Sequence, residues 1–242
     1  MQLRVRVIDD ADTLADLAAV SIVRSLEAAL ADSEDPVSLF LSGGSTPRVT
    51  YTRLVEQDLD WSRVHVFLGD ERWVDTDHQD SNARMAREAF VEDIEATFHV
   101  LPTHFESPHE AADHYEQTLA ELFGSEQFKA DLVILGIGTD GHTASLFPGT
   151  EALEETDRLY VANWVPGIEM WRLSATFRLL HHASEVMFLA TGSAKAEVVA
   201  QILEGEIAYP ARTVMEGAAN VTWFLDRSAA SHLSAEFLAA HI

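Results

Sequence analysis

The sequence VILGIGTDGHTASLFPG, residues 133–149, decides the fold, because an apolar run breaks abruptly into a glycine-rich loop. The run from Leu132 to Ile137 has no charged residue, which is typical of a central parallel strand buried on both faces. The loop holds four glycines together with the ionisable pair Asp140 and His142. In open parallel sheets, ligands bind beyond the carboxyl ends of the strands. The stretch therefore predicts a parallel α/β fold with a site directly after this strand.

The same alternation of apolar runs and helical patterns extends through the chain. Apolar runs predict strands at 3–8, 37–42, 64–69, 131–138, 158–164, 171–177, 185–192 and 220–226. Helical spacing predicts helices at 10–31, 47–57, 81–94, 108–123, 193–204 and from about 228. Strand–helix–strand repetition favours a mostly parallel sheet covered on both faces. We therefore expect one domain over residues 1–242, a three-layer α/β/α Rossmann-like sandwich.

The charge balance limits the partners. The 242 residues include 16 Lys and Arg against 40 Asp and Glu, a formal net charge of −24. This excess of acid argues against nucleic acid or an anionic membrane as a partner, because phosphate contacts need a basic face. An anionic small ligand would need cations gathered locally, and Lys129 and Lys195 are the two lysines of the sequence. The chain contains no cysteine, and its N-terminus lacks the pattern of a signal peptide, so we expect a cytoplasmic protein.

A second glycine-bearing loop, SGGSTP at 42–47, follows the apolar run VSLFL. Gly43 and Gly44 let the backbone turn sharply, and Ser45 and Thr46 add hydroxyl donors at the start of a predicted helix. The positive end of that helix dipole favours an anion. The loop is compatible with a phosphate cradle and equally with an ordinary tight turn into a capped helix, because it is neither a Walker loop nor a dinucleotide fingerprint.

Asp140 and His142 flank a single glycine, so both side chains can project from one turn. An imidazole with an ordinary pKa near ~6.5 can accept a proton from water at neutral pH. A neighbouring carboxylate fixes its tautomer and favours its charged form. The pair is suited to act as a general base with its orienting group.

Six segments resemble a known family in order and approximate spacing. They run over residues from about 10 to 228 and are LSGGSTP, LGDERWV, SNARMAREAF, GIGTDGHTASLFPG, WRLSATF and GSAKAEV. The chain resembles the 6-phosphogluconolactonases, which share a fold with glucosamine-6-phosphate deaminases and ribose-5-phosphate isomerases. The DGHTASLFP segment is highly specific, whereas SGGSTP is shared across the wider superfamily.

The resemblance implies hydrolysis of 6-phosphoglucono-δ-lactone to 6-phosphogluconate, the second step of the oxidative pentose phosphate pathway. It implies that His142 activates the attacking water beside Asp140. The same resemblance implies a substrate- and phosphate-binding set of Ser42, Gly43, Gly44, Ser45, Thr46, Arg72, Asn82, Arg172 and Lys195. Neither a cofactor nor a metal has a role in this chemistry. The sequence leaves the oligomeric state open, and a monomer is compatible with it.

Two alternative functions, an amino-sugar-phosphate deaminase and a sugar-phosphate sensor, use the same fold. An amino-sugar-phosphate deaminase carries a glutamate before the proline of the DGH segment, where this chain has Phe147, and tends to show Asp-Glu-Tyr where this chain has Asp-Glu-Arg at 70–72. A catalytically silent sugar-phosphate sensor would retain SGGSTP without needing the base, yet both Asp140 and His142 are present. Both comparisons favour the lactonase.

Overall fold

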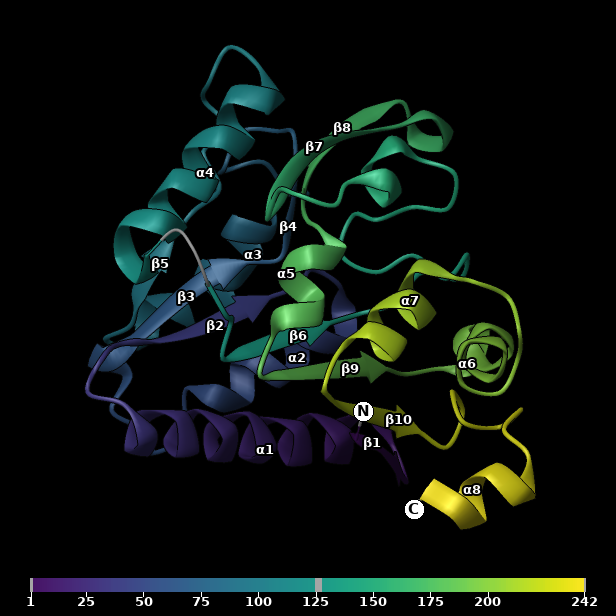
Figure 1. Ribbon diagram of the computed structural model, residues 1–242. Coiled ribbons are helices and arrows are strands. Elements are labelled where there is room, and N and C mark those ends of the chain that lie inside the picture. The colour runs from purple at the N-terminus through teal and green to yellow at the C-terminus, as the bar shows by residue number, and fades with distance from the viewer. Residues whose placement is uncertain (1, 125–127, 242) are drawn as a thin grey trace.

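A seven-stranded parallel sheet forms the centre of the protein in the computed structural model, which describes residues 2–124 and 128–241 (Figure 1). Every neighbouring pair of its strands runs parallel. In spatial order the strands are β1 (Gln2–Ile8), β10 (Asn220–Asp226), β9 (Glu185–Ala190), β6 (Leu132–Leu135), β2 (Val37–Leu41), β3 (Val64–Leu68) and β5 (Thr97–His99).

Helices cover both faces of this sheet. In Figure 1, α1 and α2 lie below the sheet, and α5 and α7 lie above it. The helices are α1 (Ala11–Asp32), α2 (Ser45–Leu54), α3 (Asn82–Ala89), α4 (Pro108–Phe123), α5 (Phe177–His182), α6 (Ala196–Leu203), α7 (Pro210–Gly217) and α8 (Ala235–His241). This arrangement confirms the predicted three-layer α/β/α fold. None of the helices in the described ranges is both long and apolar enough to cross a membrane.

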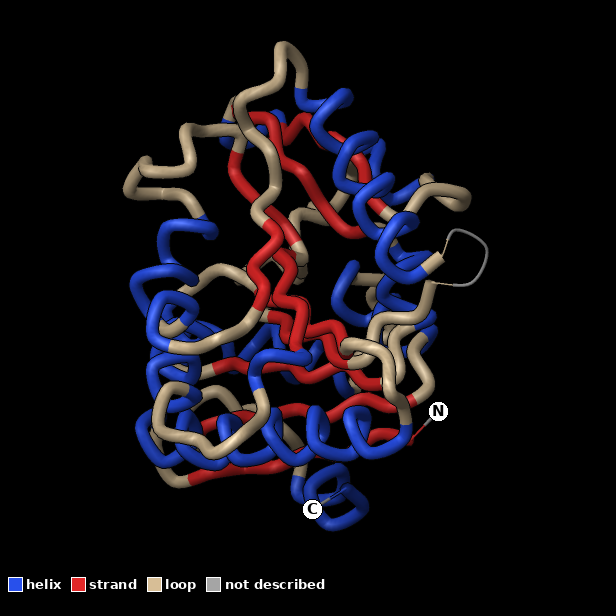
Figure 2. Tube along the Cα trace, turned by 90° about the vertical axis from the view of Figure 1, so that its left-hand side faces the viewer, coloured by secondary structure: helices blue, strands red, loops and turns tan. Residues whose placement is uncertain are grey.

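A second, smaller sheet departs from the parallel pattern that the sequence predicted. Its three antiparallel strands are, in spatial order, β4 (Asp70–Arg72), β8 (Met170–Ala175) and β7 (Tyr160–Val165). The segments at 158–164 and 171–177 are strands as expected, but only a short turn joins them. A parallel crossover needs a dozen or more residues, so this connection permits only a hairpin. Figure 2 shows the small sheet rising above the stacked parallel strands.

Side-chain caps start the helices α1, α3 and α4. The Asp10 carboxylate accepts from the Thr13 N–H at 2.8 Å at the start of α1, Ser81 caps α3, and Ser107 caps α4. The predicted helix boundaries differ most from the structure at two helices, since α3 ends at Ala89 rather than at 94 and the last helix begins at Ala235 rather than near 228. The helix α2 differs from these three, because Gly44 at its N-cap offers no side chain.

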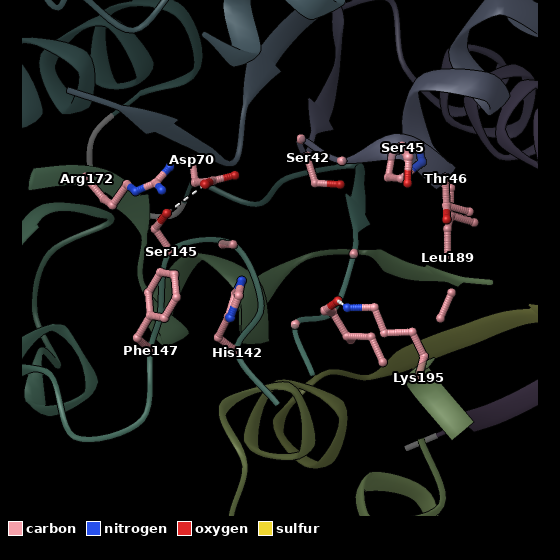
Figure 3. A pocket seen from close by; sticks show the side chains of 18 of the residues that line it. Ser42, Ser45, Thr46, Asp70, His142, Ser145, Phe147, Arg172, Leu189 and Lys195 are labelled. Carbon is pink, nitrogen blue, oxygen red and sulfur yellow. Dashed lines mark hydrogen bonds between the residues drawn. The ribbon is translucent and has the colours of Figure 1, made fainter. Parts of the chain in front are cut away.

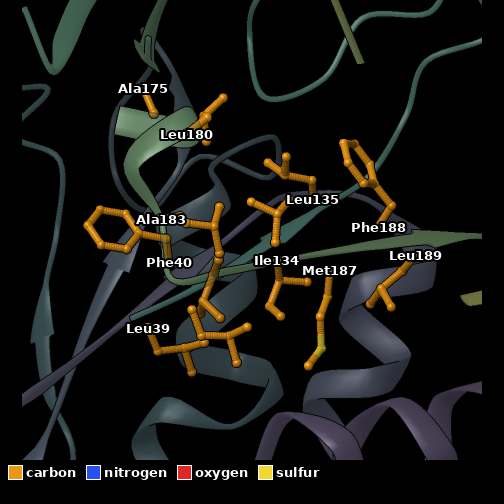
Figure 4. Packing of buried hydrophobic residues seen from close by; sticks show 14 of the residues in the cluster. Leu39, Phe40, Ile134, Leu135, Ala175, Leu180, Ala183, Met187, Phe188 and Leu189 are labelled. Carbon is orange, nitrogen blue, oxygen red and sulfur yellow. The ribbon is translucent and has the colours of Figure 1, made fainter. Parts of the chain in front are cut away.

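The hydrophobic core fixes the strands from which the site loops leave. Figure 4 shows side chains on both faces of the sheet, with Leu135 of β6 and Phe188 of β9 on one face and Ile134 of β6 and Met187 of β9 on the other, while Phe40 lies on β2. All five are buried, at 2% exposure or less. Successive strand residues point to opposite faces, so a strand this apolar must be covered on both sides. The loops after β2 and β6 therefore begin from fixed positions.

Candidate active site

A cleft of about 410 Å³ opens where β2, β3, β6 and β9 end (Figure 3). It lies at the carboxyl ends of these parallel strands, where the sequence predicted a ligand site. Its lining combines two glycine-rich loops with charged groups on the small sheet and on the segment after β9. The polar and charged side chains in the lining are Ser42, Ser45, Thr46, Asp70, Arg72, His142, Ser145, Arg172, Thr191 and Lys195.

The SGGSTP loop presents the N-terminus of α2 to the cleft. Gly44 has a φ of 111°, which only glycine adopts without strain, and it leads directly into Ser45, the first residue of the helix. Because no side chain caps the helix, its first N–H groups are free to bind a ligand. The Ser42 hydroxyl is buried in the cleft wall and has no hydrogen-bond partner among the described residues. The Thr46 hydroxyl bonds to that of Thr191 at 2.7 Å. The loop therefore presents backbone N–H groups and short hydroxyl side chains to the cleft.

His142 and Asp140 form a hydrogen-bonded pair in the loop after β6. The Nδ1 of His142 lies 2.6 Å from an Asp140 carboxylate oxygen, and the His142 N–H also donates to that oxygen. A carboxylate only accepts, so this bond places the proton on Nδ1 and leaves Nε2 with a free lone pair. Figure 3 shows the imidazole projecting into the cleft. Asp140 itself is not part of the lining; its side chain is 49% exposed, against 28% for His142.

Two neighbours hold the His142–Asp140 pair in place. A Cβ on Gly138 would lie 2.1 Å from His142 Nδ1 and 2.4 Å from the Asp140 oxygen, so the pair requires glycine at that position. On the other side, the Phe147 ring stacks on the imidazole with ring centroids 4.0 Å apart. Phe147 thus occupies the position at which the deaminase pattern needs a titratable glutamate.

Lys195 reaches the cleft from the turn Ser193–Lys195 that follows β9. Its Nζ donates to the carbonyl oxygen of Ile137 at 2.8 Å, which leaves two ammonium protons for a ligand. Burial lowers the pKa of Lys195, and the Asp140 carboxylate opposes that shift. In Figure 3 the lysine lies on the same side of the cleft as Ser45 and Thr46.

The opposite end of the cleft is formed by the small sheet. Arg72 and Arg172 are paired in register on β4 and β8, and both line the cleft. Burial lowers the pKa of the Arg172 guanidinium, and the Asp70 carboxylate opposes that shift. The Nε atoms of both arginines are buried without a partner among the described residues. Figure 3 shows Arg172 and Lys195 at opposite ends, so the predicted cations do not form a single cluster.

Asn82 lies behind the wall of the cleft rather than in its lining. It is 1% exposed, and its side-chain amide donates to the backbone oxygen of Asp70 at 2.9 Å and to its carboxylate at 3.2 Å. A Cβ on Gly43 would lie 2.1 Å from the Asn82 Oδ1, so Gly43 is glycine because Asn82 packs against it. Asn82 therefore couples the SGGSTP loop to Asp70.

The structure brings every predicted site residue except Asp140 and Asn82 into the lining, and these two support residues that line it. Sequence reasoning missed Asp70 and Ser145. The position of Asp70, two residues after the end of β3, was a signal that could have identified it. Ser145 gave no such signal, because its hydrogen bond to Asp70 joins residues that are 75 positions apart along the chain. The described ranges hold no group of three or more His, Cys, Asp or Glu placed to bind a metal ion.

The fold and the cleft define an α/β protein whose cleft is lined by an uncapped helix N-terminus and by a histidine that is hydrogen-bonded to a carboxylate. Residues 9–223 match the family described as glucosamine-6-phosphate isomerases/6-phosphogluconolactonase, and the chain belongs to this family. It is 39% identical to the 6-phosphogluconolactonase of Synechocystis sp. over 96% of this chain and 99% of that protein. It is 38% identical to the Nostoc sp. 6-phosphogluconolactonase over 97% and 100% of the two chains. The solved 6-phosphogluconolactonase of Trypanosoma cruzi aligns with a TM-score of 0.85 and 31% identity, over 97% of this chain and 98% of that one.

Proposed function

We propose that this protein hydrolyses 6-phosphoglucono-δ-lactone to 6-phosphogluconate, with His142 as the base that activates water. The observation that carries the proposal is the bond between His142 Nδ1 and Asp140, on an imidazole that projects into a cleft floored by a helix N-terminus. The relatives of nearly full length named 6-phosphogluconolactonase support the same activity.

The phosphate binds at the end of the cleft formed by the SGGSTP loop and Lys195. The uncapped N-terminus of α2 supplies N–H donors and the positive end of its dipole, and the lysine supplies a charge. The substrate phosphate is several bonds away from the lactone carbonyl. Its binding energy therefore holds the reacting carbon in place without taking part in the chemistry.

The reaction needs one proton acceptor and no covalent intermediate. His142 Nε2 takes a proton from water as the water oxygen bonds to the lactone carbonyl carbon. The bond from that carbon to the ring oxygen then breaks, and the imidazolium returns the proton to the ring oxygen as the ring opens. Asp140 stabilises the imidazolium between the two steps. Arg172 at the far end of the cleft is placed to stabilise the negative charge that develops on the carbonyl oxygen.

We propose that residues 1–242 form one domain, because one hydrophobic cluster runs from Val5 to Leu233. We also propose that the protein is cytoplasmic and that its partner is a small sugar-phosphate lactone. We expect it to bind neither nucleic acid nor a membrane. No cofactor or metal enters the reaction as written.

A direct assay tests the activity. Freshly prepared 6-phosphoglucono-δ-lactone is added to the protein, and acid release is followed against the spontaneous background. We expect release well above background, and much slower turnover of the unphosphorylated lactone. If the protein binds 6-phosphogluconate but leaves lactone hydrolysis at the background rate, it is a sugar-phosphate sensor and the proposal fails. Ammonia release from glucosamine 6-phosphate would point to the deaminase instead.

A further inference from the structure

Asp70 is a buried carboxylate in the cleft that the proposed reaction does not use. It is 6% exposed and lies in the lining, two residues beyond the end of β3. One carboxylate oxygen accepts from the Ser145 hydroxyl at 2.7 Å, and the other accepts from the Asn82 amide at 3.2 Å (Figure 3). A carboxylate has about four acceptor positions. Two therefore remain for a ligand in the cleft.

Asp70 also has an unsatisfied charge. No salt bridge to Asp70 forms within residues 2–124 and 128–241, although the charge of Arg172 is close enough to interact with it. Arg172 likewise leaves its Nε without a partner in the same residues. Burying an acid and a guanidinium close together without a direct bond is costly unless a ligand bonds to both.

The two groups have complementary chemistry. Arg172 can only donate hydrogen bonds, and the Asp70 carboxylate can only accept them. A carbonyl oxygen only accepts, and a hydroxyl group can donate. A ligand that carries a hydroxyl on the carbon next to its carbonyl satisfies both residues at once.

We propose that Asp70 recognises the hydroxyl group on the carbon adjacent to the lactone carbonyl, while Arg172 binds the carbonyl oxygen. This inference rests on the proposed function, because it needs the phosphate at the SGGSTP–Lys195 end of the cleft. In Figure 3, His142 lies between Lys195 and the Asp70–Arg172 end, so a phosphate bound at the lysine would direct the sugar ring past His142 toward Asp70 and Arg172. Asp70 is then a specificity residue that selects 2-hydroxy lactones, and Ser145 and Asn82 orient it.

The test compares 6-phosphoglucono-δ-lactone with its 2-deoxy analogue. A hydrogen bond from a ligand hydroxyl to a charged group is expected to favour the 2-hydroxy lactone by about 10- to 100-fold in kcat/KM. The wild-type protein alone gives the first readout, and it needs no variant to fold. Equal kcat/KM on the two lactones would overturn the inference while leaving the proposed function intact. Hydrolysis of neither lactone would refute the proposed function instead.

Variants give the second readout. For Asp70→Ala we expect the preference for the 2-hydroxy lactone to collapse, with kcat/KM on the 2-deoxy lactone within about 3-fold of wild type. If Asp70 had only a structural role, Asp70→Ala would lower kcat/KM equally for the two lactones. That outcome would also overturn the inference. Asp70→Asn keeps the side-chain shape and one acceptor oxygen, so it replaces the alanine variant if that variant does not fold. We expect Asp70→Asn to lose most of the preference for the 2-hydroxy lactone. Asp131→Asn is the matched control, because Asp131 bonds Ser38 at the opposite end of the strands and should leave the preference unchanged.

Discussion

The two glycine-rich loops leave neighbouring parallel strands at the same edge of the sheet, yet they present different groups to the cleft. The loop after β2 enters helix α2 within a few residues, so it offers the cleft backbone N–H groups and short hydroxyls. The loop after β6 continues for more than a dozen residues before a short 3-10 helix at Glu151–Glu154, and it carries the Asp140–His142 pair on a turn closed by the Gly138 N–H bond to the His142 carbonyl oxygen at 2.8 Å. Backbone donors bind an anion regardless of side-chain chemistry, whereas proton transfer needs an oriented side chain.

The comparison of the two loops predicts that the β2 loop binds the substrate and that the β6 loop carries out the proton transfer. If it is correct, changes to the β6 loop reduce kcat, and changes to the β2 loop or to Lys195 raise KM. A substitution in one loop that changes the parameter assigned to the other would break this division.

The largest effect is expected for His142→Ala. Loss of a general base should lower kcat by at least ~100-fold, with KM for the phosphorylated lactone little changed. Steady-state hydrolysis of freshly prepared lactone measures both parameters. Thermal unfolding checks that the variant remains folded, which we expect because the side chain is partly exposed. Near-normal turnover in a folded variant would remove His142 from the mechanism.

Gly138→Ala tests the geometry of the same loop without removing a functional group. The added Cβ would lie 2.1 Å from His142 Nδ1, so the imidazole and the Asp140 carboxylate must move apart. Misplacing a catalytic group by about 1 Å can cost up to about 100-fold in rate. We expect kcat to fall by about 10- to 100-fold.

Gly167→Ala is the matched control, because its Cβ would meet nothing within 4 Å and its φ is not positive. That variant should retain wild-type kcat. Equal kinetics for the two glycine variants would show that the His142–Asp140 bond does not limit turnover.

The sequence predicted the parallel sheet because its strands are buried on both faces, and such burial appears as an apolar run. The apolar runs that begin at Leu132 and at Val37 both form central strands, β6 and β2. It did not predict that residues 158–164 and 171–177 leave that sheet, because local periodicity is the same in parallel and antiparallel strands. Only the shortness of the connection between them indicated a hairpin, and β4 at Asp70–Arg72 is too short to give a periodic signal.

The candidate site divides in the same way. Residues with a local motif, such as His142 and the SGGSTP loop, could be identified from the sequence. Asp70 could not be assigned a role, because its environment comes from Ser145 and Asn82, which are 75 and 12 residues away along the chain. The separation of Lys195 from Arg172 is also a tertiary property, since one follows β9 and the other lies on the small sheet.

Lys195→Ala should produce a moderate effect on the binding side of the comparison. Removing a charge-assisted bond to phosphate should raise KM by about 10-fold or more, with kcat within about 3-fold of wild type. Lys129→Ala is the matched control, because Lys129 is exposed and lies outside the cleft. It should leave both parameters unchanged. A fall in kcat alone in the Lys195 variant would contradict an anchoring role and place the lysine with the chemistry.

The smallest effects come from the groups that anchor each loop to the protein. The buried Tyr51 hydroxyl accepts from the Ser42 N–H at 3.0 Å and donates to the Ser42 carbonyl oxygen at 3.1 Å, which fixes the start of the binding loop. In the loop after β6, the Thr143 hydroxyl donates to the Gly136 carbonyl oxygen at 2.8 Å. Tyr51→Phe and Thr143→Val each delete these bonds while nearly preserving the side-chain shape.

Each of these two variants should lose about 1–3 kcal/mol of unfolding free energy, because buried backbone groups are left unpaired. Denaturant unfolding measures that loss. Their kinetics should then differ, with Tyr51→Phe raising KM a few-fold and Thr143→Val lowering kcat by a similar factor, since each loosens only the loop it anchors. Should both variants shift the same kinetic parameter, the two loops would act as one unit, and the division between a binding loop and a catalytic loop would have to be abandoned.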